Sequence, residues 1–272
     1  MGHRPNMLEA ASLPSLPYVS HEILLQVNAE EADTATLAHT LGREPSLAAR
    51  IVSTANSAFY AGQGSISGLD EAVMRLGLYR LRVLATSILL RNQFDSSRCP
   101  GFQPARYWQH AIATAGASGR LAQAVALDPA PAQLAGLLHS IGVLLLAHSF
   151  PRELDEVFAT RSRQPDAGLA ALIRTQLDVD HHEAGGMLLR EWELPVTVCA
   201  LVEAMGTPGA DREPGLLGLL RNAANWADTG FDDPVPSALR DLGLDANALS
   251  RVGGACRREH EETVALAGLL AD

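Results

Sequence analysis

The sequence predicts an all-α, multi-helical protein in which an N-terminal helical subdomain packs on a C-terminal one. Apolar residues recur three and four positions apart in nearly every segment, which is typical of amphipathic helices. Ala and Leu dominate, and β-branched clusters with the two-residue alternation of strands are few. With 272 residues and 47% hydrophobic side chains, the chain can bury a sizeable core.

The N-terminal half is predicted to cover residues 13–95, after a flexible N-terminus at residues 1–12 that shows no helical pattern. It opens with an extended segment, because Pro14 and Pro17 do not fit a helix interior. The apolar spacing then predicts helices over residues 20–27, 34–41, 45–59 and 69–90.

A polar stretch ending in Pro100-Gly101 is predicted to link this half to a second one at residues 104–205. A C-terminal extension, residues 206–272, is expected to be helical and to complete the second half. The helices expected across both segments lie at residues 104–125, 134–146, 151–161, 167–177, 180–192, 195–205 and 216–228, with shorter ones up to residue 270.

Residues Leu134–Leu146 are predicted to form the central core helix, because they are apolar on every side except at His139-Ser140. The stretch is shorter than the roughly 20 apolar residues that cross a bilayer. Gly136 and Gly142 would let neighbouring backbones come close. Two polar side chains in such a place need hydrogen-bond partners or a ligand.

Composition narrows the class of protein. A net charge of -10 disfavours nucleic acid as the main partner. The three cysteines are widely spaced, which indicates neither a disulfide framework nor a zinc site. No signal peptide or membrane-spanning pattern is present, so we expect a cytoplasmic protein that does not act at a membrane.

Several motifs occur in one order along residues 13–205. They are Leu13-Pro-Ser-Leu-Pro17, Glu44-Pro-Ser-Leu47, Ala55-Asn-Ser-Ala-Phe-Tyr60, Met74-Arg-Leu-Gly-Leu-Tyr-Arg-Leu-Arg82, Trp108-Gln-His110, Ala135-Gly-Leu-Leu-His-Ser-Ile-Gly142, Asp180-His181 and Trp192-Glu-Leu-Pro195. Together they resemble the HDOD domain of bacterial signalling proteins. The resemblance implies an all-helical fold related to HD-type metal phosphohydrolases, in which residues 104–205 would form the HD-like half. It also implies a mostly non-catalytic output or scaffold role, sometimes in cyclic-dinucleotide pathways.

The resemblance places a vestigial HD site at His110, His139 with Ser140, and Asp228. Ser140 stands where an HD enzyme has aspartate, and a neutral hydroxyl cannot replace a carboxylate that bridges metals. His110, His139 and Asp228 could still hold one ion, because three protein ligands and a water form a known arrangement. We favour the alternative in which both histidines are hydrogen-bonded core residues, and we expect no bound metal or cofactor.

Asp180 and His181 form a second candidate site at the start of a predicted helix. Adjacent helical residues point about 100° apart, so His181 and His182 would not face one ion together. We expect Asp180 to cap the helix and His182 to be solvated. The family's frequent His-rich end to the next helix is absent, since the chain has Ala204-Met-Gly206.

Arg75 and Arg82 form a candidate partner face, because residues seven apart share one side of a helix. An acidic protein or a phosphorylated ligand could dock there. The alternative, which we favour, is a solvated face with ordinary ion pairs to neighbours such as Glu71.

These observations favour a non-enzymatic signalling module that acts by binding a protein partner. Two alternatives stay open: a degenerate phosphohydrolase with weak single-metal activity, and a nucleotide sensor that uses the vestigial cleft without cleavage. Ser140 and the absent late histidines favour the first and third interpretations over the second. The sequence identifies neither the partner, nor the input signal, nor the oligomeric state.

Overall fold

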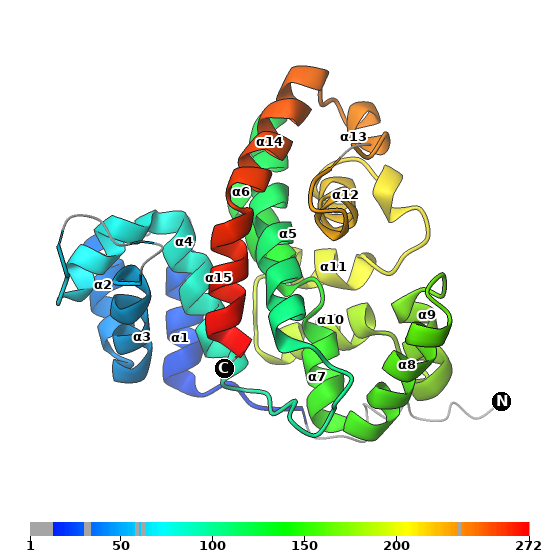
Figure 1. Ribbon diagram of the computed structural model, residues 1–272, viewed down its shortest axis with the longest axis horizontal. Coiled ribbons are helices and arrows are strands. Elements are labelled where there is room, and N and C mark those ends of the chain that lie inside the picture. The colour runs from blue at the N-terminus through cyan, green and yellow to red at the C-terminus, as the bar shows by residue number, and fades with distance from the viewer. Residues whose placement is uncertain (1–12, 30–33, 58–59, 61–63, 233–234, 272) are drawn as a thin grey trace.

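The protein folds into two groups of helices (Figure 1). The computed structural model describes residues 13–29, 34–57, 60, 64–232 and 235–271. No strand occurs in these ranges, which confirms the all-α prediction. The flexible N-terminus expected at residues 1–12 lies outside the described residues.

Four helices form the N-terminal half, at the left of Figure 1: α1 (Tyr18–Val27), α2 (Thr34–Gly42), α3 (Pro45–Ala55) and α4 (Leu69–Arg91). Each turns an apolar face inward, and α4 packs against the other three. Pro45 starts α3, where its missing N–H costs nothing. The Asn56 side chain then anchors the following segment by hydrogen bonds to both the N–H and the carbonyl of Ile66.

Helix α4 is bent, which the apolar spacing did not predict. Gly77 has φ 74° and ψ 161°, values outside the helical region that glycine reaches without strain. The bend divides α4 into a shorter first part and a longer second part, whose Ile88, Leu89 and Leu90 belong to the core shared with the C-terminal half. Arg75 and Arg82 therefore lie on opposite sides of a kink. The expectation that they share one helical face is wrong, because that register requires a continuous helix.

Helix α5 (Pro104–Ala124) is the axis of the C-terminal half, and later helices pack around it (Figure 1). The elements that follow α5 are α6 (Pro129–Leu138), α7 (Ile141–Ser149), α8 (Pro151–Arg163), α9 (Leu169–Leu177), α10 (His181–Glu191), α11 (Val196–Ala204), η1 (Ala210–Arg212), α12 (Leu216–Asp228), α13 (Ala238–Asp241), α14 (Ala246–Arg258) and α15 (His260–Ala271). Of these, α6, α12, α14 and α15 pack directly against α5. The positions of all these elements agree with the predicted segments except in the central stretch.

The central stretch is two helices rather than one. Helix α6 ends at Leu138, α7 begins at Ile141, and His139 and Ser140 form the turn between them. By length and composition alone Pro129–Ser149 could cross a membrane, but 78% of its apolar window is buried inside the protein. Such burial is typical of a helix in the core of a protein. The polar residues His139 and Ser140 therefore lie between two apolar helices and not inside one.

Two glycines allow the close packing around this turn. A Cβ on Gly136 would lie 2.4 Å from the Ser118 hydroxyl, so α6 can approach α5 only without one. A Cβ on Gly142 would lie 1.9 Å from the backbone oxygen of His181, where nothing flexible can yield. Gly142 therefore lets the start of α7 touch the start of α10. The sequence predicted a close approach at this glycine but not the segment that makes it. That contact places the turn beside His181 and His182.

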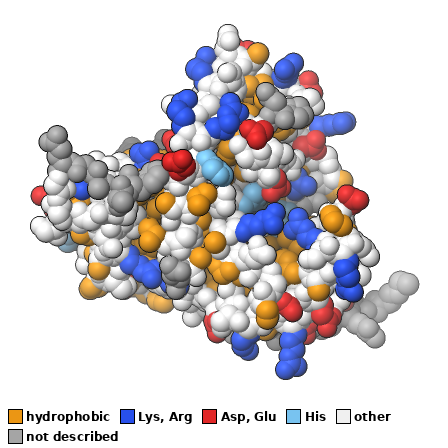
Figure 2. Space-filling model, viewed as in Figure 1, with side chains coloured by type: hydrophobic (Ala, Val, Ile, Leu, Met, Phe, Trp, Pro, Cys, Tyr) orange, Lys and Arg blue, Asp and Glu red, His pale blue; other side chains and the backbone are white. Residues whose placement is uncertain are grey.

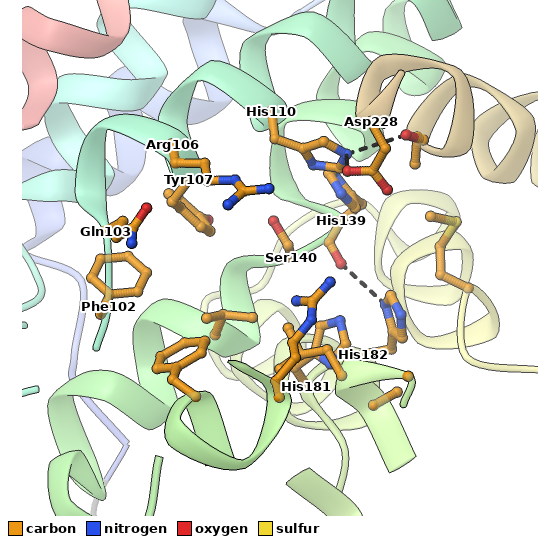
Figure 3. Close-up of a pocket in the computed structure, with 18 of the residues that line it drawn as sticks. Phe102, Gln103, Arg106, Tyr107, His110, His139, Ser140, His181, His182 and Asp228 are labelled. Carbon is orange, nitrogen blue, oxygen red and sulfur yellow. Dashed lines mark hydrogen bonds and ion pairs between the residues drawn. The ribbon is translucent and has the colours of Figure 1, made fainter. Parts of the chain in front are cut away.

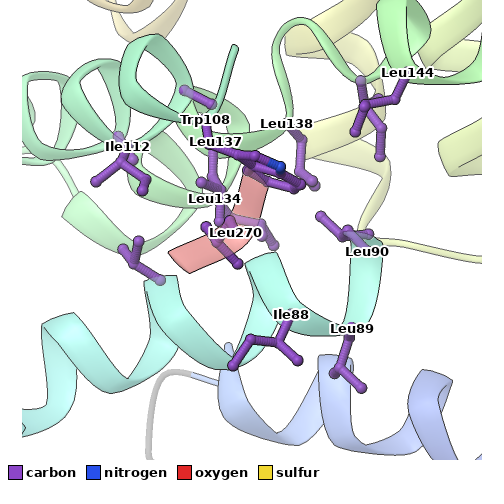
Figure 4. Packing of buried hydrophobic residues seen from close by; sticks show 14 of the residues in the cluster. Ile88, Leu89, Leu90, Trp108, Ile112, Leu134, Leu137, Leu138, Leu144 and Leu270 are labelled. Atoms are coloured by element: carbon purple, nitrogen blue, oxygen red, sulfur yellow. The ribbon is translucent and has the colours of Figure 1, made fainter. Parts of the chain in front are cut away.

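The two halves share one hydrophobic core (Figure 4). Ile88, Leu89 and Leu90 of α4 belong to the same cluster as Trp108 of α5 and Leu138 of α6. A second, smaller cluster lies around Trp226, between α5, α12 and α14. Burying large apolar side chains contributes about 1.5–3 kcal/mol each, so this shared core holds the halves together.

Helix α15 lies between the two halves and connects them by charge as well as by apolar contact (Figure 1). Its buried Glu262 pairs with Arg80 of α4 and accepts a hydrogen bond of 2.6 Å from the Tyr60 hydroxyl. Glu259, just before this helix, pairs with Arg120 of α5 at 2.5 Å. The end of the chain is therefore part of the joint between the halves.

Candidate functional site

A cleft of about 710 Å³ opens in the C-terminal half, where α5, the turn between α6 and α7, α8, α10 and α12 meet (Figure 3). All the residues of the vestigial site predicted from the sequence line it, although they come from three separate parts of the chain. They are His110 from α5, His139 and Ser140 from the turn, and Asp228 from the end of α12. His181 and His182 border the same cleft.

His110 and Asp228 form a pair at the rim of the cleft. The His110 Nε2 atom is 3.2 Å from Asp228 Oδ1 and 3.2 Å from the backbone oxygen of Ala224. Partial burial is the largest single influence and opposes ionisation of Asp228, but the hydrogen bond with His110 and the nearby His110, His139 and Arg161 together outweigh it, so the pKa of this carboxyl is lowered. A smaller cavity of about 270 Å³ is also bordered by His110 and Asp228, which separate it from the main cleft.

His139 is buried at the floor of the cleft. Its Nδ1 atom is 2.7 Å from the Gly136 oxygen, which orients the ring toward His110, and the two ring centroids are 5.0 Å apart. Burial, followed by the nearby His110, lowers the pKa of His139 to about 3. The ring is therefore neutral at neutral pH, as expected for a hydrogen-bonded core histidine.

Ser140 lines the open part of the cleft, and Tyr107 lines the cleft near it (Figure 3). Burial raises the pKa of the Tyr107 hydroxyl well above its ordinary value, although the nearby Ser140 hydroxyl opposes this slightly. The phenol is thus a neutral group at working pH. The position that the resemblance assigns to the aspartate of HD enzymes holds the neutral hydroxyl of Ser140 here.

Asp180 caps helix α10, as predicted, by accepting hydrogen bonds from the backbone N–H groups of His182 and Glu183. The expectation that His182 is solvated is wrong, since the residue is only 5% exposed. Its ring stacks on His181 at 4.0 Å, and its Nδ1 atom is 3.2 Å from the His139 oxygen. The close approach at Gly142 causes this burial, because it brings the turn against the start of α10.

The donors of the cleft do not fit a metal ion as they stand. In the described parts of the chain, no group of three or more His, Cys, Asp or Glu side chains is placed to hold one. His110 Nε2 is already engaged by Asp228 and a backbone oxygen, and Ser140 supplies no charge. The single-ion arrangement of His110, His139 and Asp228 is therefore not preformed.

The proposed partner face on α4 is not an open charged surface. Arg75 donates to the backbone oxygens of Ala55 and Gly64, at 3.3 and 3.1 Å. Arg82 donates to the oxygen of Ala29 at 2.6 Å. Both side chains are half-buried and support chain segments at the ends of neighbouring helices.

Three arginines that the sequence analysis did not single out also line the cleft: Arg106 of α5, Arg161 of α8 and Arg221 of α12. They lie more than 50 residues apart along the chain, so no motif joins them. Only the motif around Trp108 and His110 pointed to this part of α5. Arginine and histidine side chains gather in the middle of the face shown in Figure 2.

A helical fold in which histidines from separate helices converge on one cleft defines a protein of the HD-related, all-α class. The chain belongs to the HDOD domain family, whose model matches residues 13–208. This confirms the resemblance seen in the sequence motifs. Asp228 and Arg221 lie beyond the matched range, so α12 adds residues to the cleft from outside it.

Solved structures share this fold. A putative phosphohydrolase from Shewanella amazonensis SB2B has 26% identity and a TM-score of 0.72, with 95% of each chain covered. A putative signal transduction protein from Marinobacter aquaeolei VT8 has 25% identity and a TM-score of 0.80, and the match covers 100% of this chain and 62% of that longer one. The MmoQ response regulator from Methylococcus capsulatus str. Bath has 28% identity and a TM-score of 0.50, with 89% and 97% covered. No curated protein matches the sequence.

Proposed function

We propose that this HDOD protein is a non-catalytic signalling module that acts by binding a protein partner. One observation carries the proposal: Ser140, with its neutral hydroxyl, occupies the point of the cleft where metal hydrolysis needs a carboxylate. Activation of water at neutral pH by a metal requires ligands that hold the ion and lower the pKa of its water. A neutral serine hydroxyl does neither.

The similar structures supply support of two kinds. A putative signal transduction protein and a response regulator share the fold, and their names favour a role in signalling. The putative phosphohydrolase favours the competing interpretation, a weak hydrolase. The His110–Asp228 pair decides between them in our proposal, because it engages two of the three remaining donors with each other.

Metal analysis with turnover assays tests the absence of catalysis. Protein purified without chelator is assayed with Mn²⁺, Fe²⁺ and Mg²⁺ on a phosphodiester and on nucleotides. We expect no stoichiometric metal and no turnover. One metal per chain, together with turnover lost in His139→Ala, would overturn the proposal.

Ser140→Asp sharpens this test. Loss of a partner outside the ligand set already costs 10–100-fold in affinity or activity, so a missing ligand costs more. We expect the variant to gain weak metal binding with only partial activity, because His110 is still paired with Asp228. Capture of partners from the native cell, compared between the wild type and a cleft variant, tests the binding role itself.

A further inference from the structure

The cleft is positively charged in an acidic protein. The chain carries a net charge of -10, yet the charged residues that line the cleft are Arg106, Arg161 and Arg221 against the single carboxylate of Asp228. That carboxylate is already paired with His110. A local excess of positive charge in a concave site attracts anions and raises their local concentration.

The arginines of the cleft keep hydrogen-bond donors free. Arg106 and Arg161 are exposed at its mouth and make no ion pair with any described residue. Arg221 uses Nη1 for the Met205 oxygen at 3.0 Å and makes no ion pair with the described chain either. A guanidinium has five N–H donors in a planar fork that matches phosphate oxygens. Figure 3 shows the Arg106 side chain reaching over the cleft toward Ser140.

A buried histidine with one unpartnered ring nitrogen borders the same cleft. His181 is 7% exposed and lines the cleft, and its Nδ1 atom has no hydrogen-bond partner among the described residues. A buried polar group without a partner costs about 1–3 kcal/mol, so its retention calls for an explanation.

Ser140 removes an obstacle to anion binding. An aspartate at this point without a metal ion would place a negative charge beside any phosphate in the cleft, and like charges repel. The Ser140 hydroxyl is neutral and can donate or accept a hydrogen bond. The substitution that disfavours catalysis therefore favours the binding of an anion in the absence of metal.

The other end of the cleft is apolar. Phe102, Phe158 and Leu169 line it beside Gly101, with the two phenyl centroids 6.4 Å apart. The total of about 710 Å³ lies within the roughly 300–1,000 Å³ typical of small-molecule sites. A ligand that fills both ends carries phosphate on one side and an uncharged, flat or apolar group on the other.

We propose that the cleft binds a small organic phosphate, with its phosphoryl oxygens held by Arg106, Arg161 and Arg221 and its uncharged part beside Phe102 and Phe158. The inference rests on the proposed function in one respect: the ligand is bound and not cleaved. Ligand occupancy would then set the state that a protein partner recognises.

Calorimetric titration in EDTA tests this with three probes: ADP, inorganic pyrophosphate and adenosine. We expect ADP to bind more tightly than pyrophosphate, and adenosine to bind weakest. Arg161→Gln should lose at least about tenfold in ADP affinity, because a charged hydrogen bond is removed. Arg152→Gln is the matched control, since Arg152 lies on the same helix, carries the same charge and does not line the cleft. Ser140→Asp should also weaken ADP binding when no metal is present.

Each outcome decides a part of the proposal. Failure of both ADP and pyrophosphate to bind overturns it, as does an equal loss in Arg152→Gln, which would show only long-range attraction. Pyrophosphate binding as tightly as ADP overturns the role of the apolar end. Hydrolysis of bound ADP on adding Mn²⁺ would overturn the non-catalytic function while leaving the binding site supported. Absence of both binding and turnover would overturn this inference alone.

Discussion

In the N-terminal half, Arg75 and Arg82 donate to backbone oxygens of neighbouring segments, whereas in the C-terminal half Arg106 and Arg161 border a cleft without an ion pair to any described residue. All four lie on helices and are partly or fully exposed to water. The difference is whether the fold already satisfies their donors. Arginines that hold loops serve stability, and arginines left with free donors around a concavity are available to a ligand.

The same contrast holds along the central stretch, where Leu138 and Ser140 are two residues apart. Leu138 is fully buried in the core that joins the halves, and Ser140 faces the cleft (Figures 3 and 4). A useful test therefore compares changes on the core side, which should affect stability, with changes on the cleft side, which should affect it little.

The largest expected effect is at the core side. Leu138→Ala should lower the free energy of unfolding by about 2–5 kcal/mol, because the surrounding helices cannot collapse into the space. Ser140→Ala should lower it by less than about 1.5 kcal/mol, since one hydroxyl contact is lost. Chemical denaturation monitored by circular dichroism measures both. Equal losses would mean that the two sides are not energetically distinct.

Acid sensitivity should be concentrated at the cleft. Burial lowers the pKa of His139 to about 3 and holds the pKa values of His181 and His182 below their ordinary value as well. Unfolded histidines protonate near pH 6.5, so below that pH the unfolded state binds more protons. The free energy of unfolding should therefore be full above about pH 6.5 and decrease as the pH falls from there toward 3.

His139→Gln should make this decrease less steep, and His39→Gln, which changes an exposed residue of α2 in the other half, should leave it unchanged. Denaturation midpoints measured between pH 4 and 8 give the slopes. An unchanged slope in His139→Gln would show that the ring is not a buried neutral group in the folded protein.

A smaller effect is expected at the joint between the halves. Glu262→Gln keeps the shape of the side chain but removes the charge that pairs with Arg80, whose side chain is 38% exposed. Water screens such a pair, so we expect a loss of about 1 kcal/mol that shrinks at high salt. Salt-dependent unfolding of the variant and the wild type measures it. A loss that does not change with salt would assign the role of Glu262 to packing.

The sequence predicted the helices and the family, because they are encoded locally or in motifs. It also named four residues that the structure brings to one cleft, His110, His139 and Ser140 from motifs and Asp228 from the resemblance alone. Proline, glycine and apolar spacing placed nearly every helix within a few residues. What it missed depends on contacts between distant segments. At the turn, the His139 ring is hydrogen-bonded to the Gly136 oxygen of α6, and the His139 backbone oxygen is hydrogen-bonded to His182 of α10. The second of these contacts comes from a distant segment, which nothing within Leu134–Leu146 itself signals.

The cleft arginines were missed for the same reason. Arg106, Arg161 and Arg221 converge only through the packing of α5, α8 and α12, while Arg75 and Arg82 looked like a shared face because a heptad spacing assumes an unbroken helix. Gly77, between the two arginines, is the one signal in the sequence that indicates a break, since glycine disfavours a helix interior. The burial of His182 likewise follows from a contact that the sequence does not show, the approach of Gly142 to His181.

The smallest expected effects compare the two kinds of arginine directly. Arg75→Gln removes donors to two backbone oxygens, so it should cost about 0.5–1 kcal/mol of unfolding free energy. Arg106→Gln removes a side chain at the mouth of the cleft without an ion pair in the described chain, and it should change stability by less than about 0.5 kcal/mol. Both variants lose one positive charge and gain the same amide, so any effect of net charge is common to the two and cancels in their difference. Denaturation measured side by side at one pH and salt concentration gives that difference. A larger loss at Arg106 than at Arg75 would contradict this comparison. It would show that the stability of the fold depends more on the cleft arginine than on the arginine that binds backbone oxygens.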